Sequence, residues 1–326
     1  MNFFQKAIFF GLTPFLLSFS AKADIKVVTT IKPLHSLISS VMEGVGEPSL
    51  IIEGTSNPHT FVFKPSHAQM LEEADIVFWI GEDLEAFMEK PLNSLANNAK
   101  KISFLELSSI EKLKFREENI FDDHDGHEDE HEGHDDHDDH DGHEDEHEGH
   151  DDHHGHHHGE FDSHIWLDPA NAKEMVLEIS HELSELDPNN KNKYEMNADK
   201  TIASLNELIN DVNNSISKDA SYVVFHDAYQ YFENRFGVSS SGALTLNTDV
   251  LPGAKQISEI QDLISDKDIK CIFSEPQYNP KIIESLASDM NILTGTMDPL
   301  GAYLEEGPKM YETLIKEISN SLKKCS

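Results

Sequence analysis

Short runs of apolar and β-branched residues alternate with amphipathic segments along most of the chain. The runs predict strands, and segments with apolar residues every three or four positions predict helices. In the first half of the chain, strands are expected at 25–31, 49–52, 75–80 and 102–105. In the second half they are expected at 222–225, 243–246, 270–273 and 292–296. Helices are expected at 33–43, 66–73, 82–89, 172–186, 227–236, 254–264, 280–288 and 309–322.

A longer helical pattern separates the two halves and predicts a helix over 189–217, roughly 40 Å long. One face of it carries apolar residues at spacings of three and four, namely Ile202, Leu205, Ile209, Val212 and Ile216. The alternation of strands and helices predicts an α/β fold. We expect two lobes, each with a four-stranded parallel sheet flanked by helices, joined by this one long rigid helix. The predicted divisions are an N-terminal lobe at 24–170, a helical segment at 171–218 and a C-terminal lobe at 219–326.

The first 23 residues have the pattern of a secretory signal peptide. Lys6 precedes an apolar run, and Ala21-Lys22-Ala23 provides a cleavage site of small residues. The alternative is a membrane anchor, but the run is short and Pro14 interrupts it. We therefore expect export, cleavage after Ala23 and a soluble, periplasmic mature protein.

The charge is concentrated in one segment, residues 122–160. The chain has 25 basic and 61 acidic residues, a net charge of −36, which argues against nucleic acid as a partner. Residues 122–160 contain only Asp, Glu, His and Gly, and sixteen residues, 122–137, are repeated at 138–153. Without apolar residues, this insert is expected to be disordered. Its imidazoles and carboxylates predict loosely held zinc, copper or nickel ions; the alternative is a solvated acidic loop without a metal role.

Six histidines lie outside the insert. His59, His164 and His226 follow strand ends or lie in turns next to aromatic residues, and ligands of open α/β sheets bind beyond the carboxyl ends of strands. The three could converge on one interlobe cleft as metal ligands, or be ordinary loop histidines. Asp298, at the end of the last strand, could complete a tetrahedral site or simply cap a turn. The other histidines, His35, His67 and His181, are expected to be surface or first-turn residues.

The only two cysteines are Cys271 and Cys325. In an exported protein such a pair predicts a disulfide, which would fix the last helix to the second sheet. The alternative is two free buried thiols.

Several motifs in a fixed order give the chain a resemblance to a known family. They are Pro58-His59-Thr60-Phe61, His164-Ile165-Trp166-Leu167-Asp168-Pro169, Phe225-His226-Asp227-Ala228-Tyr229, Ser274-Glu275-Pro276-Gln277 and Asp298-Pro299-Leu300-Gly301. With the insert before the second histidine, they resemble the metal-binding substrate-binding proteins of bacterial ABC importers, most closely the periplasmic zinc-uptake (ZnuA-type) proteins.

The resemblance implies a Zn²⁺ site between the lobes with His59, His164 and His226 as ligands. The fourth ligand is then Asp298 or a water, with Asp298 slightly favoured. It also implies the Cys271–Cys325 disulfide and delivery of zinc to an ABC permease in the inner membrane, and we expect a monomer.

Three functions are consistent with the sequence. The first is a zinc carrier without catalytic activity. The second is a zinc hydrolase, since three histidines and an open position also occur in catalytic sites, but no H-E-x-x-H motif is present. The third is a metal buffer or adhesin in which the insert is the main element. We expect the carrier, with one tight cleft site and additional weak ions in the insert.

Overall fold

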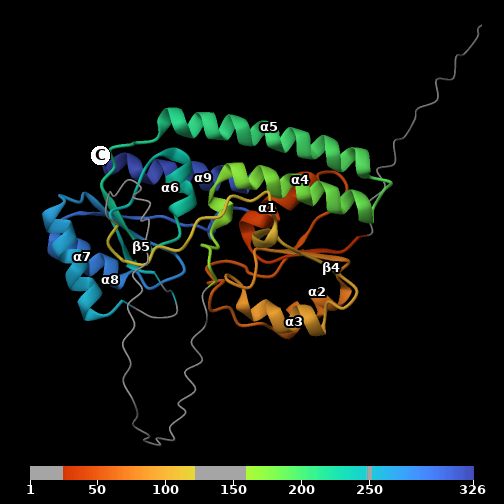
Figure 1. The fold of residues 1–326 in the computed structure, drawn as a ribbon, viewed down its shortest axis with the longest axis horizontal. Helices are drawn as coiled ribbons and strands as arrows, with labels where there is room; N and C mark the ends of the chain where they lie inside the picture. Colours follow the sequence, from red (N-terminus) through yellow and green to blue (C-terminus); the bar gives the residue numbers. More distant parts are fainter. Residues whose placement is uncertain (1–24, 122–158, 247, 249–251) are drawn as a thin grey trace, which may run out of the picture.

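Two parallel sheets form the framework of the protein (Figure 1). The computed structural model describes residues 25–121, 159–246, 248 and 252–326. The first sheet has the order β2-β1-β3-β4 and the second the order β6-β5-β7-β8. The strands of the first sheet are β1 (Val27–Thr29), β2 (Ser49–Leu50), β3 (Ile76–Trp79) and β4 (Lys100–Ser103). Those of the second are β5 (Tyr222–His226), β6 (Ala243–Thr245), β7 (Cys271–Ser274) and β8 (Leu293–Thr296).

Every pairing between these strands is parallel, which confirms the predicted fold class. We call the β1–β4 sheet with its helices the first lobe and the β5–β8 sheet with its helices the second lobe. Helices of the first lobe are α1 (Lys32–Val41), α2 (Pro65–Glu73) and α3 (Glu89–Ser94). Helices of the second are α6 (Gln230–Phe236), α7 (Ala254–Asp266), α8 (Lys281–Met290) and α9 (Met310–Ser321).

The helix predicted at 82–89 begins later in the sequence, at Glu89. The expected helix at 82–89 is a turn, followed by the 3₁₀ helix η1 (Ala86–Met88) and then α3. Pro91 lies in the first turn of α3, where a missing backbone N–H removes no helical hydrogen bond. In the turn before it, the Glu85 carboxylate accepts hydrogen bonds from the backbone amides of Ile80 and Gly81. These hydrogen bonds to the Glu85 side chain hold residues 82–85 in a turn instead of a helix.

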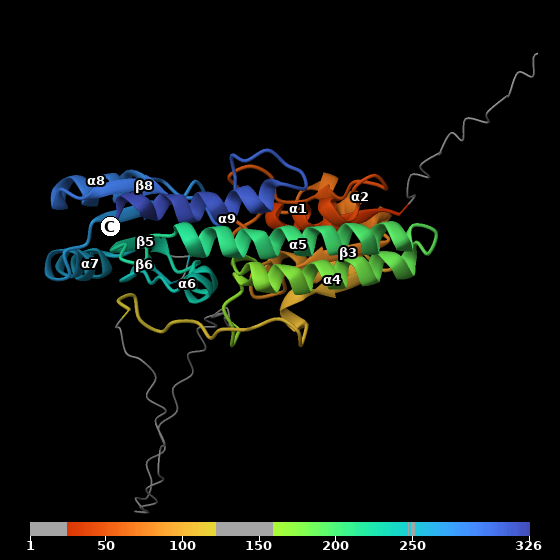
Figure 2. The ribbon, with the colours of Figure 1, turned by 90° about the horizontal axis from the view of Figure 1, so that it is seen from above.

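The predicted linking helix is α5 (Lys191–Ser215), 25 residues long. It extends from the outer end of the first lobe to the second lobe and runs beside α4 (Pro169–Leu186) (Figure 2). It also packs against α1 of the first lobe and α9 of the second. Because Tyr194, Leu205, Leu208 and Val212 are buried along it, the helix is held over its length.

A single hydrophobic cluster runs through both lobes. It includes Val28 and Phe78 of the first sheet, Leu205 of α5, and Val224 and Tyr311 of the second lobe. A second cluster, on the outer side of the second sheet, contains Val223, Phe225 and Ile272. The continuous core joins the two lobes, so the proposed divisions at 170 and 218 stay a prediction.

The chain end is fixed to the second sheet by a Cys271–Cys325 disulfide, as predicted. The carbonyl of Cys325 also accepts a hydrogen bond from the Ser221 amide. The predicted signal peptide and residues 122–158 of the insert lie outside the described residues. Within the described part of the chain, no helix combines the length and apolar character needed to cross a membrane.

Candidate metal centre

The structure brings together the three histidines that the sequence singled out. His59 lies in the loop between β2 and α2, His164 immediately precedes the 3₁₀ helix η3 (Ile165–Leu167), and His226 is the last residue of β5. One ring nitrogen of each lies within 4.8 Å of the others. The site therefore forms where the β2–α2 loop and the carboxyl end of β5 face each other across the lobes, the edge at which α/β sheets bind ligands.

Two of the rings are oriented by buried carboxylates. His164 Nδ1 lies 2.7 Å from Asp162 Oδ1, and His226 Nδ1 lies 2.8 Å from both carboxylate oxygens of Glu275. A carboxylate only accepts hydrogen bonds, so in each pair the imidazole Nδ1 donates its hydrogen. This leaves the Nε2 lone pair of both rings available, the arrangement that holds metal-ligating histidines in place.

The two Nε2 atoms face each other at 3.2 Å. With both hydrogens on Nδ1, two lone pairs meet at this distance, and a cation between them would turn their repulsion into attraction. Two nitrogens bound to one tetrahedral zinc at ~2.0–2.1 Å are about 3.3 Å apart. The space between the rings has a volume of about 10 Å³, enough for a single water-sized or ion-sized occupant. Chemistry, spacing and size thus fit one small cation.

His59 is held differently from the other two histidines. It lies on an irregular loop and is only half-buried, whereas His164 and His226 are each 4% exposed. The Asn57 Oδ1 atom accepts a hydrogen bond of 2.9 Å from the His59 backbone amide, which fixes the turn. Pro58, which lies between Asn57 and His59, is buried and lines the site. The first lobe therefore contributes its loop ligand through a turn and not through a strand end.

Asp298 has other partners than the three histidines. Its Oδ1 atom accepts hydrogen bonds from Gln277 Nε2 and from the Leu300 amide, and its Oδ2 atom accepts one from the Ala302 amide. Asp298 also does not belong to the group formed by one ring nitrogen each of His59, His164 and His226, which lie within 4.8 Å of one another. Asp298 as a fourth ligand stays a prediction; in this arrangement the carboxylate organises the loop that lines the site through Pro299 and Leu300.

A buried charged network lies behind His226. Arg116 Nη1 is 2.6 Å from Asp227 Oδ1, and its Nη2 is 2.7 Å from Glu233 Oε2. Burial raises the pKa of the Asp227 carboxyl to about 7, against the opposing effect of Arg116. Arg116 belongs to the segment that leads into the insert, so this network ties that segment to the turn that follows His226.

The remaining histidines of the described chain are not in the cluster. His67 Nδ1 accepts a hydrogen bond from the Lys64 amide and caps α2. His35 lies in the first turn of α1, as expected, and is buried there; its Nε2 lies 3.2 Å from the Pro48 carbonyl oxygen, and burial lowers its pKa. His181 is exposed on α4 near Glu182 and Glu185, but Lys100 already pairs with both carboxylates.

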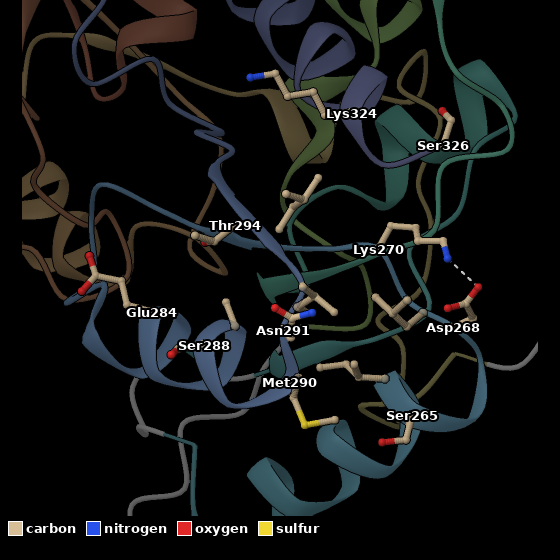
Figure 3. A pocket seen from close by; sticks show the side chains of 15 residues that line it. Ser265, Asp268, Lys270, Glu284, Ser288, Met290, Asn291, Thr294, Lys324 and Ser326 are labelled. Carbon is tan, nitrogen blue, oxygen red and sulfur yellow. Dashed lines mark hydrogen bonds and ion pairs between the residues drawn. The ribbon is translucent and has the colours of Figure 1, made fainter.

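A larger groove of about 940 Å³ lies at the opposite edge of the second sheet, where the residues just before β7 and β8 line it (Figure 3). The Asp268–Lys270 ion pair lies within it. In the described residues, neither of the two groups suited to hold a metal ion belongs to this groove. Size alone therefore does not identify the site; the convergence of imidazoles does.

The sequence did not assign roles to Asp162 and Glu275, the carboxylates that orient the rings. Asp162 lies two residues before His164, and Glu275 lies directly after β7, beside the strand that ends at His226. A carboxylate next to a predicted ligand, or at the end of the adjacent strand, is the signal that would have pointed to them.

The chain matches the family "Zinc-uptake complex component A periplasmic" (ZnuA) over residues 27–325. It is 42% identical over 303 residues to the high-affinity zinc uptake system protein ZnuA of Brucella abortus (strain 2308), covering 92% of this chain and 91% of that protein. It is 34% identical over 305 residues to the ZnuA protein of Yersinia pestis, covering 93% and 92%.

Solved structures share the fold. A crystal structure of ZnuA superposes with a TM-score of 0.70 at 21% identity and covers 92% of this chain and 100% of that chain. The laminin-binding protein Lmb of Streptococcus agalactiae gives a TM-score of 0.70 at 20% identity, covering 93% and 100%. The family match over residues 27–325 and the 42% identity to the Brucella abortus protein establish that the chain belongs to the ZnuA family of periplasmic zinc-uptake components.

Proposed function

We propose that the protein is a carrier that captures one Zn²⁺ ion between its lobes in the periplasm and delivers it to an ABC permease of the inner membrane. His59, His164 and His226 bind the ion, and a water or Asp298 takes the fourth position. Three neutral imidazoles favour zinc, whereas manganese sites contain more oxygen. The protein catalyses no reaction in this role, in keeping with a family of substrate-binding components.

A single observation carries the proposal. Two buried carboxylates turn the Nε2 atoms of His164 and His226 toward each other at 3.2 Å, and a nitrogen of His59 completes the group. Holding two lone pairs face to face is unfavourable without a cation. The arrangement is thus built for a metal ion, and the relatives named as high-affinity zinc uptake proteins indicate which one.

Residues 1–23 are proposed to be a signal peptide that is cleaved on export, and the mature protein is proposed to act as a monomer without nucleic acid as a partner. The family's periplasmic description supports export. We also retain the predicted domain divisions at 170 and 218 as part of this proposal, with the metal between the two lobes.

The insert is proposed to bind additional zinc ions more weakly than the cleft. Its C-terminal end supports an arm attached near the site. Phe121, just before the insert, donates its amide hydrogen to the Ser241 carbonyl, and Phe161, just after it, pairs with Lys114. Asp162 and His164 follow Phe161 at once, so the arm ends beside the cleft, whereas it begins next to the amino end of β6. Tethering raises the local concentration of captured ions at the cleft.

Calorimetry on mature protein tests both parts. The intact protein should show one tight zinc event followed by weaker ones, and deletion of 122–160 should remove only the weaker ones. His226→Ala should abolish the tight event, because it removes a preorganised ligand. Tight binding that survives in His226→Ala would refute the site, and loss of the tight event on deletion would refute the auxiliary role of the insert.

A further inference from the structure

One hydrogen bond connects the ligand loops of the two lobes without involving a ligand nitrogen. Asn57 Nδ2, in the β2–α2 loop, donates a hydrogen bond of 3.1 Å to Tyr278 Oη, in the loop between β7 and α8. Both residues line the space between the three histidines. The bond therefore closes one side of the metal site by joining the two lobes.

Each end of this bond is coupled to a different histidine. On the first lobe, the same Asn57 side chain accepts the His59 amide hydrogen through Oδ1. This contact also fixes the orientation of the amide, since Oδ1 must face the His59 N–H and Nδ2 must face Tyr278. Movement of His59 away from the site thus carries Asn57 with it and breaks the bond to Tyr278.

On the second lobe, Tyr278 is held against His226. Its ring stacks on Phe225 at a centroid distance of 4.4 Å and meets the His226 ring edge-on at 5.8 Å. The Tyr278 amide donates to the carbonyl of Glu275, whose carboxylate orients His226. The tyrosine is therefore fixed on the rigid side of the site.

The two sides differ in how firmly they are held. His164 and His226 are buried and carboxylate-bound, and His226 ends a strand. His59 lies on an irregular, half-buried loop. An ion that enters or leaves must displace the side of the site that moves most easily, which is the His59 loop.

We propose that the Asn57–Tyr278 hydrogen bond is a latch that sets the rate of zinc exchange, with Tyr278 as a positioning residue that holds the His59 loop closed. The proposal rests on the function proposed above. Neither group is a ligand, so the bond can form with or without the ion. A latch of this kind slows entry and exit by the same factor and leaves the equilibrium affinity nearly unchanged.

Tyr278→Phe tests this, because it removes the hydroxyl and keeps the ring stacked on Phe225. Zinc release is followed by stopped-flow mixing with excess chelator, and association by mixing with free zinc. We expect both rate constants to rise about threefold to tenfold, the effect of one hydrogen bond, while the dissociation constant changes by less than about twofold. Tyr303→Phe, the same change at an exposed tyrosine, is the matched control and should leave both rates unchanged.

Asn57→Ala provides a second test of the latch. It removes the latch and the turn contact to His59, so release should be at least as fast as in Tyr278→Phe. Adding Tyr278→Phe to Asn57→Ala should have no further effect, because the bond is already absent. Thermal unfolding of each variant is measured as the check that the fold is retained.

The outcomes separate the latch from the proposed function. Unchanged rates in Tyr278→Phe, additive effects in the double variant, or faster release with unchanged association and a correspondingly weaker affinity would each overturn the latch. If the unsubstituted protein bound no zinc, or bound it independently of His226, the proposed function itself would fail.

Discussion

The Nε2 atoms of His164 and His226 lie 3.2 Å apart, although His164 lies just before η3 and α4, with α4 packed on α1 of the first lobe, and His226 ends β5 of the second. Their other nitrogens donate to Asp162 and Glu275, so neither ring can turn its lone pair away without losing a buried hydrogen bond. The pair is thus the most rigid part of the proposed zinc site, and His59 is the part that adapts.

Replacing Glu275 with Gln is expected to weaken zinc binding about 10-fold to 100-fold, the usual effect of removing a carboxylate that orients a metal-ligating histidine. The side-chain shape is kept, but the charge that favours the Nδ1–H form of His226 is lost. Competition with a zinc chelator measures the change. Glu305→Gln, at an exposed loop position, is the control, and an affinity of Glu275→Gln equal to it would show that the carboxylate has no such role.

Replacing Asp298 with Asn distinguishes a ligand from a loop organiser. The NH₂ group of the amide faces either the Ala302 amide or the Leu300 amide, depending on which carboxylate oxygen it replaces, so one accepted hydrogen bond is lost and we expect a clear loss of thermal stability. Zinc affinity should fall by less than about tenfold, since the three imidazoles remain. A loss of tight binding comparable to that of His226→Ala would instead establish Asp298 as the fourth ligand.

Glu85 is expected to make the stability of the zinc-free protein depend on pH. Burial raises its pKa from 4.5 to about 7, although the Gly81 amide, the Thr30 hydroxyl and the Ile80 amide oppose the shift. Since the folded-state pKa is the higher one, this group favours folding below about pH 4.5, and its contribution is lost as the pH rises through about 7.

The free energy of unfolding should therefore fall by roughly 2.5 kcal/mol relative to Glu85→Gln between pH 5 and pH 8, from 1.36 kcal/mol per pKa unit. Urea denaturation at both pH values measures this difference. Glu82→Gln, an exposed neighbour, should follow the parent protein. Equal pH dependence in Glu85→Gln and the parent would contradict the assignment of this carboxyl group.

Removing the Cys271–Cys325 disulfide should lower stability and leave zinc affinity intact. The bond closes a loop of 54 residues, worth about 4 kcal/mol on the chain-entropy account. Cys271 begins β7, at the edge of the sheet opposite Glu275 and His226, so the site should not change. Urea denaturation and zinc titration of the double Cys→Ala variant measure both effects. Titratable thiols in the unreduced, denatured protein would refute the bond.

The order of strands and helices was predictable because it depends on local periodicity. The apolar run at 75–80, for example, has the composition of a strand buried on both faces, and β3 is such a strand. The apolar spacing of 202–216 likewise predicted α5. The prediction at 82–89 was wrong because the Glu85 carboxylate bonds to the amides of Ile80 and Gly81, and periodicity carries no information about such side-chain contacts.

By itself, the sequence determined the fold class, the composition of the insert and three candidate histidines at strand ends and turns. Only the tertiary structure decided how they meet. Glu275 lies 49 residues after His226, and Tyr278 lies 221 residues after Asn57, yet each pair is in hydrogen-bond contact. The first contact arises because β5 and β7 are neighbours in one sheet. The second arises because the lobes pack around one core, which brings the loops of one lobe to face those of the other. Local pattern places a residue on an element, but the packing of distant elements chooses its partners.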